Sequence, residues 1–116
     1  MKSGTDLINE SKGRIRQIDA AEALTIHAQG TAVFLDCRDL QEVNLGKIPG
    51  ALHISKGNLE TKIEAAVARD ADVVIYCASG NRSALAADIM QGMGYTTVCS
   101  LAGGFRGWAE AGGDVE

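Results

Sequence analysis

Two short segments of almost uninterrupted apolar residues limit the architecture of this chain more than any other feature. They are residues 31–36 (TAVFLD) and residues 72–77 (DVVIYC), each about as long as a typical strand. A strand with one wet face alternates apolar with polar residues, whereas a continuous apolar run is typical of a strand covered on both faces. The sequence therefore predicts a parallel sheet between two layers of helices.

Helical patterns alternate with these strands along the chain. A first helix is predicted to start at Asp19, with Glu22 at the spacing of a capping box, and to end at Gly30. A second helix is expected to be capped by Asn58, and a third carries apolar residues at every fourth position, namely Leu85, Ile89 and Met93. Shorter strands are predicted at residues 15–18, 51–54 and 96–101, and a short last helix at 105–110. This alternation specifies an α/β fold.

Composition and charge agree with one folded domain over residues 1–116, with a core from about residue 15 to residue 112. Apolar residues make up 46% of the chain, and the net charge is −4 with eleven scattered Lys and Arg. Binding to a phosphate backbone requires clustered positive charge, so nucleic acid is not an expected partner. The first thirteen residues are polar and no apolar run approaches the ~18 residues of a membrane span. The cytoplasm is the expected compartment.

The three cysteines, Cys37, Cys77 and Cys99, are far apart and form no Cys-x-x-Cys pair. This spacing is typical neither of a disulfide framework nor of a zinc site. The two histidines, His27 and His53, are isolated from any cluster of carboxylates, so we expect no metal and no cofactor. We interpret Cys99, inside a predicted strand, as a packing residue.

Cys77 stands where a predicted strand passes through a glycine-containing turn directly into a helix. Such a turn can direct successive backbone N–H groups inward, and a helix N-terminus adds partial positive charge. Gly80 permits backbone angles closed to other residues, and Arg82 adds a permanent charge. Each contribution favours the thiolate, so we expect the pKa of Cys77 to lie below that of a free cysteine.

Several motifs then appear in an order that resembles the rhodanese family. The segment Cys77-x-x-Gly-x-Arg-Ser resembles the family's active-site loop. Asp36-Cys37-Arg38 resembles its Asp-x-Arg motif, and residues 46–51 (GKIPGA) resemble its Gly-His-Ile-Pro-Gly-Ala segment. Residues 94–95, 101–104 and Trp108 resemble its C-terminal signature. The resemblance covers residues 15–112.

The resemblance implies a rhodanese-like three-layer fold with a five-stranded parallel sheet, and a sulfurtransferase activity. Cys77 would take sulfane sulfur from thiosulfate or a small persulfide and pass it, as a persulfide, to cyanide or a thiol. Arg82 would support the persulfide-binding loop by its charge, and that loop would consist of Ala78, Ser79, Gly80, Asn81 and Ser83. Asp36 and Arg38 would support the site, either by contact with the substrate or as a structural ion pair that holds loops together.

One departure from the family affects the expected donor. Ala78 follows the nucleophile, where thiosulfate-preferring members often carry a basic residue. The loss of a cation there makes a small polar persulfide, or a sulfur-accepting partner protein, as plausible a partner as thiosulfate. Arg38 or Lys56 could supply the missing charge.

Three other functions are weighed against sulfur transfer. Cysteine phosphatases separate Cys and Arg by five residues, whereas only four separate Cys77 from Arg82, and a shorter loop encloses less space than a phosphate needs. A non-catalytic or partner-dependent sulfur-carrier module is a second alternative. A thiol redox enzyme is the third, and it would need Cys37 as its resolving cysteine. Cys37 occupies the variable apolar position of Asp-x-Arg, where Val is common in the family, so we interpret it as a core residue.

Overall fold

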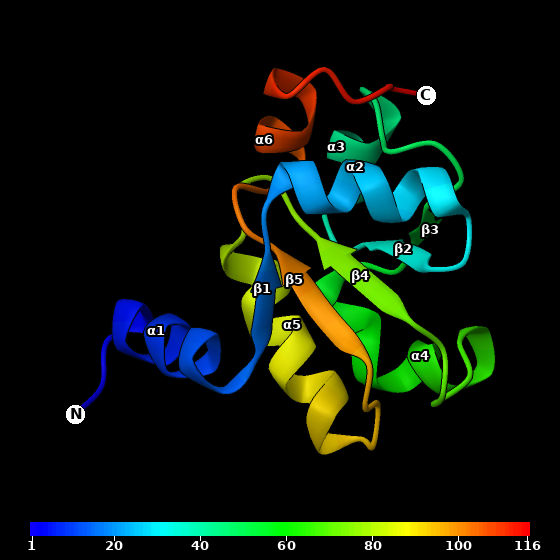
Figure 1. Ribbon diagram of the computed structural model, residues 1–116. Helices are drawn as coiled ribbons and strands as arrows, with labels where there is room; N and C mark the ends of the chain where they lie inside the picture. Colours follow the sequence, from blue (N-terminus) through cyan, green and yellow to red (C-terminus); the bar gives the residue numbers. More distant parts are fainter.

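The computed structural model covers residues 1–116 and confirms the α/β architecture with a five-stranded parallel sheet (Figure 1). The sheet order is β1-β5-β4-β2-β3, and every neighbouring pair is parallel. The strands are β1 (Arg16–Ile18), β2 (Val33–Asp36), β3 (Leu52–His53), β4 (Val73–Tyr76) and β5 (Val98–Leu101). The helices are α1 (Gly4–Arg14), α2 (Ala20–Gln29), α3 (Leu40–Asn44), α4 (Leu59–Ala66), α5 (Asn81–Gly92) and α6 (Gly104–Glu110), with one 3-10 turn, η1 (Lys56–Asn58).

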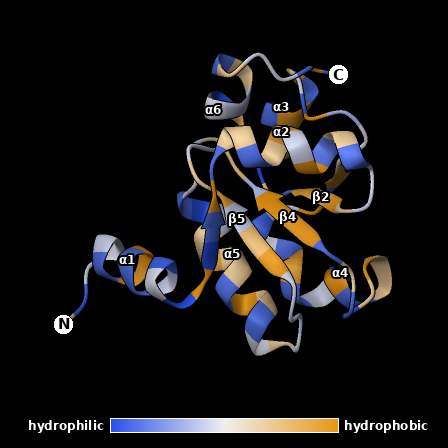
Figure 2. Cartoon of the chain, viewed as in Figure 1, coloured by the Kyte–Doolittle hydropathy of each residue, from blue (hydrophilic) through white to orange (hydrophobic).

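The two apolar runs form central strands, as predicted. Every residue of β4 and β5 is buried, whereas Arg16 and Gln17 of the edge strand β1 are exposed. Figure 2 shows the contrast, with β4 in hydrophobic colours and β1 in hydrophilic ones. Each strand is two residues shorter than its apolar run, because the hydrogen-bonded ladder covers only four of the six residues.

Helices cover both faces of the sheet. On one face α4 and α5 enclose a core that includes Leu35, Ile63, Ile75 and Met90. On the opposite face α2 and α6 enclose a second core, in which Trp108 is buried. Carboxyl ends of the strands meet α3 and α6 at one end of the molecule (Figure 1). Ligands of parallel sheets bind at this end.

The predicted helix ends are confirmed in part. The Asp19 carboxylate accepts a hydrogen bond from the N–H of Glu22 at 2.8 Å, and Gly30 ends α2 in a left-handed conformation, φ 72°. Glu22 does not complete a capping box, because its carboxylate pairs with Arg16 at 3.3 Å instead. Asn58 stands at the start of α4, but its side chain makes no cap hydrogen bond. The 3-10 turn η1 already leads the chain into that helix.

The buried face of α5 consists of small residues. Ala84, Ala86 and Ala87 are fully buried, so the helix lies close against the sheet. The predicted apolar stripe of Leu85, Ile89 and Met93 is only half-buried. A four-residue pattern therefore located the helix correctly but did not identify the face that packs most tightly.

Two helices were not predicted. α1 begins at a capping box of Ser3 and Asp6 and is fastened to α5 by Asp88, which accepts from Ser11 Oγ at 2.9 Å and from Arg14 Nη2 at 2.6 Å. α3 forms between the strands predicted at residues 31–36 and 51–54, where no helix was predicted. Neither helix carries the long apolar pattern on which the prediction depended. No helix is both long and apolar enough to cross a membrane.

Candidate functional site

Cys77 lies one residue beyond β4, at the carboxyl end of the sheet, and only 1% of its surface is exposed. Its Sγ accepts hydrogen bonds from the N–H of Gly80 at 3.1 Å and from the N–H of Ser83 at 3.3 Å. Gly80 has φ 102°, a conformation that side chains disfavour, and it turns the chain into α5. The loop thus directs two backbone donors, and the N-terminus of a twelve-residue helix, at one sulfur atom.

Two serine hydroxyls extend the set of hydrogen-bonding groups around Cys77. Ser83 Oγ lies 3.5 Å from Cys77 Sγ and 2.7 Å from Ser100 Oγ, and both serines are fully buried. When Cys77 is a thiolate, Ser83 donates its hydroxyl proton to the sulfur, because a thiolate can only accept. Ser100 in β5 then donates to Ser83. Ser100 was missed by sequence analysis, although it is the one hydroxyl in the apolar segment VCSL.

The thiol of Cys37 lies beside that of Cys77. The neighbouring thiol of Cys37, together with the donors Ser83 and Gly80, lowers the pKa of Cys77 to about 4, although burial acts in the opposite direction. The same contact and burial raise the pKa of Cys37. The direction for Cys77 agrees with the sequence expectation, but the largest cause, Cys37, was expected to be a core residue.

We expected Arg82 to support the loop by its charge, but its guanidinium is paired with a carboxylate. Its Nη1 and Nη2 donate to the two carboxylate oxygens of Glu42 in α3, at 2.7 and 3.0 Å. This pair holds the pKa of Glu42 at about 2, with the hydrogen bond from Arg82 as the main cause. Glu42 therefore compensates most of the charge of Arg82, and the pair fastens α3 to the start of α5. No sequence motif indicated this partner, because it belongs to an unpredicted helix.

Asp36 and Arg38 form a buried ion pair next to the site. Nη2 and Nε of Arg38 reach the carboxylate at 2.7 to 3.1 Å, and Nη2 also donates to the carbonyl of Gly46 at 2.7 Å. The guanidinium lies 4.4 Å from the ring centre of Phe105 in α6. Of the two roles expected for this pair, the geometry corresponds to the structural one. Arg38 is compensated by Asp36 and is therefore not the free cation that could replace a basic residue at position 78.

Gly104 lets α6 approach the loop closely. The N–H of the next residue, Phe105, donates to the carbonyl of Cys77 at 2.8 Å. Gly104 has φ +58°, and a Cβ atom built on it would lie 2.5 Å from the backbone of Cys77 and Ala78. Only glycine fits at this position, so the close packing of α6 against the loop depends on Gly104.

The other predicted loop residues do not contact the sulfur. The carbonyl of Ala78 accepts from the N–H of Arg106 at 3.2 Å, and Ser79 is exposed. Asn81 is exposed too, and its Oδ1 accepts from Lys12 Nζ of α1 at 2.9 Å. Lys12 has no carboxylate within ion-pair distance, so it places an uncompensated positive charge beside the loop. Sequence analysis missed this cation because it missed α1.

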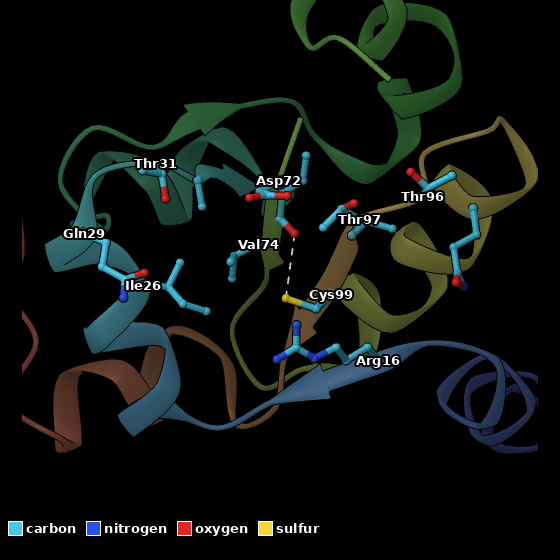
Figure 3. A pocket seen from close by; sticks show the side chains of 13 residues that line it. Arg16, Ile26, Gln29, Thr31, Asp72, Val74, Thr96, Thr97 and Cys99 are labelled. Atoms are coloured by element: carbon cyan, nitrogen blue, oxygen red, sulfur yellow. Dashed lines mark hydrogen bonds between the residues drawn. The ribbon is translucent and has the colours of Figure 1, made fainter. Parts of the chain in front are cut away.

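The cavity of the molecule lies elsewhere. Its volume is about 360 Å³, and it includes Arg16, Asp72, Thr97 and Cys99 but no residue of the loop (Figure 3). Cys99 Sγ donates to the carbonyl of Val73 at 3.7 Å, and burial raises the pKa of this thiol. Cys99 is thus a neutral buried thiol, in agreement with a packing role.

Comparison with known proteins agrees with this geometry. The model of the rhodanese-like domain family matches residues 19–111. The thiosulfate sulfurtransferase GlpE of Pseudomonas entomophila is 37% identical over 93 residues, which are 80% of this chain and 84% of that protein. A Rhodopseudomonas palustris structure, described as a protein of unknown function and possible tyrosine phosphatase, is 35% identical with a TM-score of 0.92, covering 100% of this chain and 96% of that one. The human single-domain sulfurtransferase TSTD1 is 28% identical with a TM-score of 0.74, covering 81% and 95%.

Proposed function

The chain belongs to the rhodanese-like domain family, and from this premise we propose that it is a sulfurtransferase that carries sulfur as a persulfide on Cys77. One observation carries the proposal: Sγ of Cys77 accepts two backbone hydrogen bonds, from Gly80 and Ser83, at the N-terminus of α5. Donors in this arrangement stabilise a sulfur anion without any proton transfer. The site therefore needs neither a catalytic histidine nor a metal.

The reaction has two steps. The Cys77 thiolate attacks the outer sulfur of thiosulfate, the sulfur–sulfur bond of the donor breaks, and sulfite leaves with the electron pair. The product is a Cys77 persulfide anion, which cyanide or an external thiolate then attacks at the outer sulfur. Thiocyanate or a new persulfide leaves, and the Cys77 thiolate is restored. The net charge is unchanged in each step, so no general base is required.

The residues around Cys77 have supporting roles in this proposal. Gly80 and Ser83 stabilise the anionic sulfur, and Ser100 positions the hydroxyl of Ser83. Arg82 contributes a charge that Glu42 largely compensates, and its main role is to hold the start of α5 in place. Asp36 and Arg38 keep the end of β2 in position.

The donor is either thiosulfate or a small persulfide, and the acceptor is a small thiol, cyanide or a sulfur-accepting protein. Relatives named as thiosulfate sulfurtransferases support thiosulfate. Ala78 offers no cation to a sulfonate group, and Arg38 is paired with Asp36. Lys12, which makes no ion pair, contacts the loop through Asn81.

The description of the Rhodopseudomonas structure as a possible tyrosine phosphatase makes phosphate-ester hydrolysis the second candidate. Two observations argue against it here. Four residues separate Cys77 from Arg82, which leaves a smaller loop than a phosphate group with three equatorial oxygens needs. Arg82 is also held by both oxygens of Glu42, whereas a phosphatase directs its arginine at the substrate.

Intact mass spectrometry after incubation with thiosulfate tests the proposal. When the mass is taken within the first turnover, we expect the wild type and Cys99→Ser to gain one sulfur atom, and cyanide to remove it with formation of thiocyanate. Cys77→Ser should gain none. A protein that gains no sulfur from thiosulfate, 3-mercaptopyruvate or glutathione persulfide would contradict sulfur transfer. Hydrolysis of an aryl phosphate that depends on Cys77 would favour the phosphatase.

A further inference from the structure

Cys37 and Cys77 are neighbours across the ends of two paired strands. β2 and β4 are parallel, with Asp36 beside Tyr76. The N–H of Cys37 continues this ladder, since it donates to the carbonyl of Tyr76 at 3.0 Å. The next pair in the same register is therefore Cys37 and Cys77.

Both side chains point to the same face of the sheet. They belong to the core under α4 and α5, which also contains Leu35 and Ile75, the residues two positions earlier on each strand. Neighbouring strands lie about 4.8 Å apart, and a disulfide joins Cα atoms separated by about 4.4–6.8 Å. Both thiols are free. The strand spacing at this register therefore lies within the range of Cα separations that a disulfide joins.

We propose that Cys37 is an internal acceptor for the persulfide on Cys77, so that the protein can release sulfide while it closes a Cys37–Cys77 disulfide. This inference rests on the proposed sulfurtransferase function. The Cys37 sulfur attacks Sγ of Cys77, the bond from Sγ to the outer sulfur breaks, and the outer sulfur leaves as hydrosulfide with the Cys37 proton. The Cys37 sulfur is oxidised from thiol to disulfide and the outer sulfur is reduced to sulfide, so no further oxidant is needed.

The internal route is slower than transfer to a good external acceptor. Cys37 remains protonated because burial and its contact with Cys77 raise its pKa, and a thiol is a poorer nucleophile than a thiolate. Sulfide release therefore dominates only when no acceptor thiolate is present. The disulfide then removes the Cys77 nucleophile, and sulfur transfer stops until a small dithiol reduces it.

A single-turnover experiment on the full chain tests the inference. Wild type, Cys37→Val and Cys99→Val are loaded with thiosulfate, separated from the donor, and incubated without acceptor while sulfide and intact mass are followed. We expect wild type and Cys99→Val to release one sulfide per loaded protein and to end with the mass of the disulfide form. Cys37→Val loses a neighbour that lowers the pKa of Cys77 and should load more slowly, but once loaded it should keep its persulfide until cyanide is added. Release should not depend on protein concentration.

The outcomes separate the two proposals. A wild-type persulfide that lasts as long as that of Cys37→Val overturns the internal acceptor but leaves sulfur transfer intact. Release that rises in proportion to protein concentration also overturns it, because one protein would then discharge another. Failure of every variant to load with thiosulfate or glutathione persulfide removes both proposals. Cys37→Ser, which keeps the size of the side chain, must retain its persulfide as Cys37→Val does, so that lost packing cannot account for the result.

Discussion

Cys77 and Cys99 are both buried in adjacent strands or at their ends, yet the surroundings move their pKa values in opposite directions. Cys99 lies beside the cavity, where its one polar partner is a carbonyl that accepts from it. No cavity adjoins Cys77. Its sulfur accepts hydrogen bonds from the N–H groups of Gly80 and Ser83, and the thiol of Cys37 lies beside it. Burial alone favours the neutral thiol, so the number of aimed donors decides which cysteine is ionised. The cavity beside Cys99 therefore does not locate the reactive thiol, whereas the hydrogen-bond donors around Cys77 do.

The largest effect on this contrast is expected where α6 meets the loop. Gly104→Ala brings a Cβ atom to within 2.5 Å of the backbone of Cys77 and Ala78 and forces a side chain into φ +58°. Overpacking of this kind typically costs about 1–3 kcal/mol, and a displacement of about 1 Å at a reacting group can reduce turnover about 100-fold. We expect a loss of that order in thiocyanate formation, measured beside the thermal unfolding midpoint.

Gly107→Ala is the matched control for this change. Gly107 lies in the same helix, and the nearest atom to its added Cβ is 4.0 Å away. Its activity and stability should remain close to those of the wild type. Equal losses in the two variants would mean that α6 itself, and not its approach to the loop, determines the position of Cys77.

The second change, Ser83→Ala, removes one hydrogen-bond donor from Cys77 and so makes its surroundings more like those of Cys99. A hydrogen bond to a charged group contributes about 1.5–3 kcal/mol, which corresponds to a pKa increase of about one to two units in Ser83→Ala. Starting from about 4, the pKa remains below neutrality. Alkylation of Cys77 should therefore slow near pH 5 and be unchanged near pH 8.

Ser100→Ala should shift the same profile by a smaller amount, because Ser100 acts only through the hydroxyl of Ser83. Mass mapping of the alkylated peptide separates Cys77 from the other cysteines. Wild-type profiles in both variants would show that the backbone donors and Cys37 are sufficient. The lowered pKa of Cys77 also affects the free energy of unfolding. The stabilisation by the Cys77 thiolate is present above pH 9 and is lost as the pH falls towards 4.

The sequence predicted the parts of the site that depend on local pattern. Apolar runs located β2 and β4, and the adjacent glycine turn located the loop around Cys77. Contacts between distant segments could not be predicted in the same way. Ser100 reaches Ser83 from another strand, and Glu42 reaches Arg82 from a five-residue helix with little pattern of its own.

Cys37 shows most clearly why position and role differ. The Asp-x-Arg motif placed it at the end of β2, and the apolar residue common at this position of the motif favoured a core role. The residue is indeed 1% exposed and part of the core. Only the parallel register of β2 and β4 shows that it is also the neighbour of Cys77. Cys37 is therefore both a core residue and a neighbour of Cys77.

A third change tests whether the ion pair beside the loop matters. Glu42→Gln removes the carboxylate that compensates Arg82, and both side chains are about one-third exposed, so solvent screening limits the pair to at most about 1 kcal/mol. We expect a small decrease in the free energy of unfolding that shrinks in high salt. The pKa of Glu42 is about 2, so the wild-type contribution is present above about pH 4.5 and is lost as the pH falls through 2. A loss well above 1 kcal/mol would mean that α3 depends on this pair.

The smallest effect is expected at Lys12, the cation that α1 adds beside the loop. An uncompensated charge near an anionic donor contributes on the order of 0.2–1 kcal/mol, so Lys12→Met should raise the KM for thiosulfate by up to about 5-fold and leave kcat unchanged. Lys2→Met is the control, because Lys2 lies just before the same helix but pairs with Glu10 at 2.7 Å. The difference should fall as ionic strength rises, since added salt screens exposed charges.

A donor without net charge separates attraction from position. If Lys12 acts by charge, Lys12→Arg should restore the wild-type KM, and a neutral trisulfide donor should not distinguish Lys12→Met from the wild type. If Lys12 acts by holding Asn81, both donors should be affected equally and kcat should fall as well. Because Asn81 is the first residue of α5, the second result would make α1 a positioning element for the loop and not a source of donor specificity.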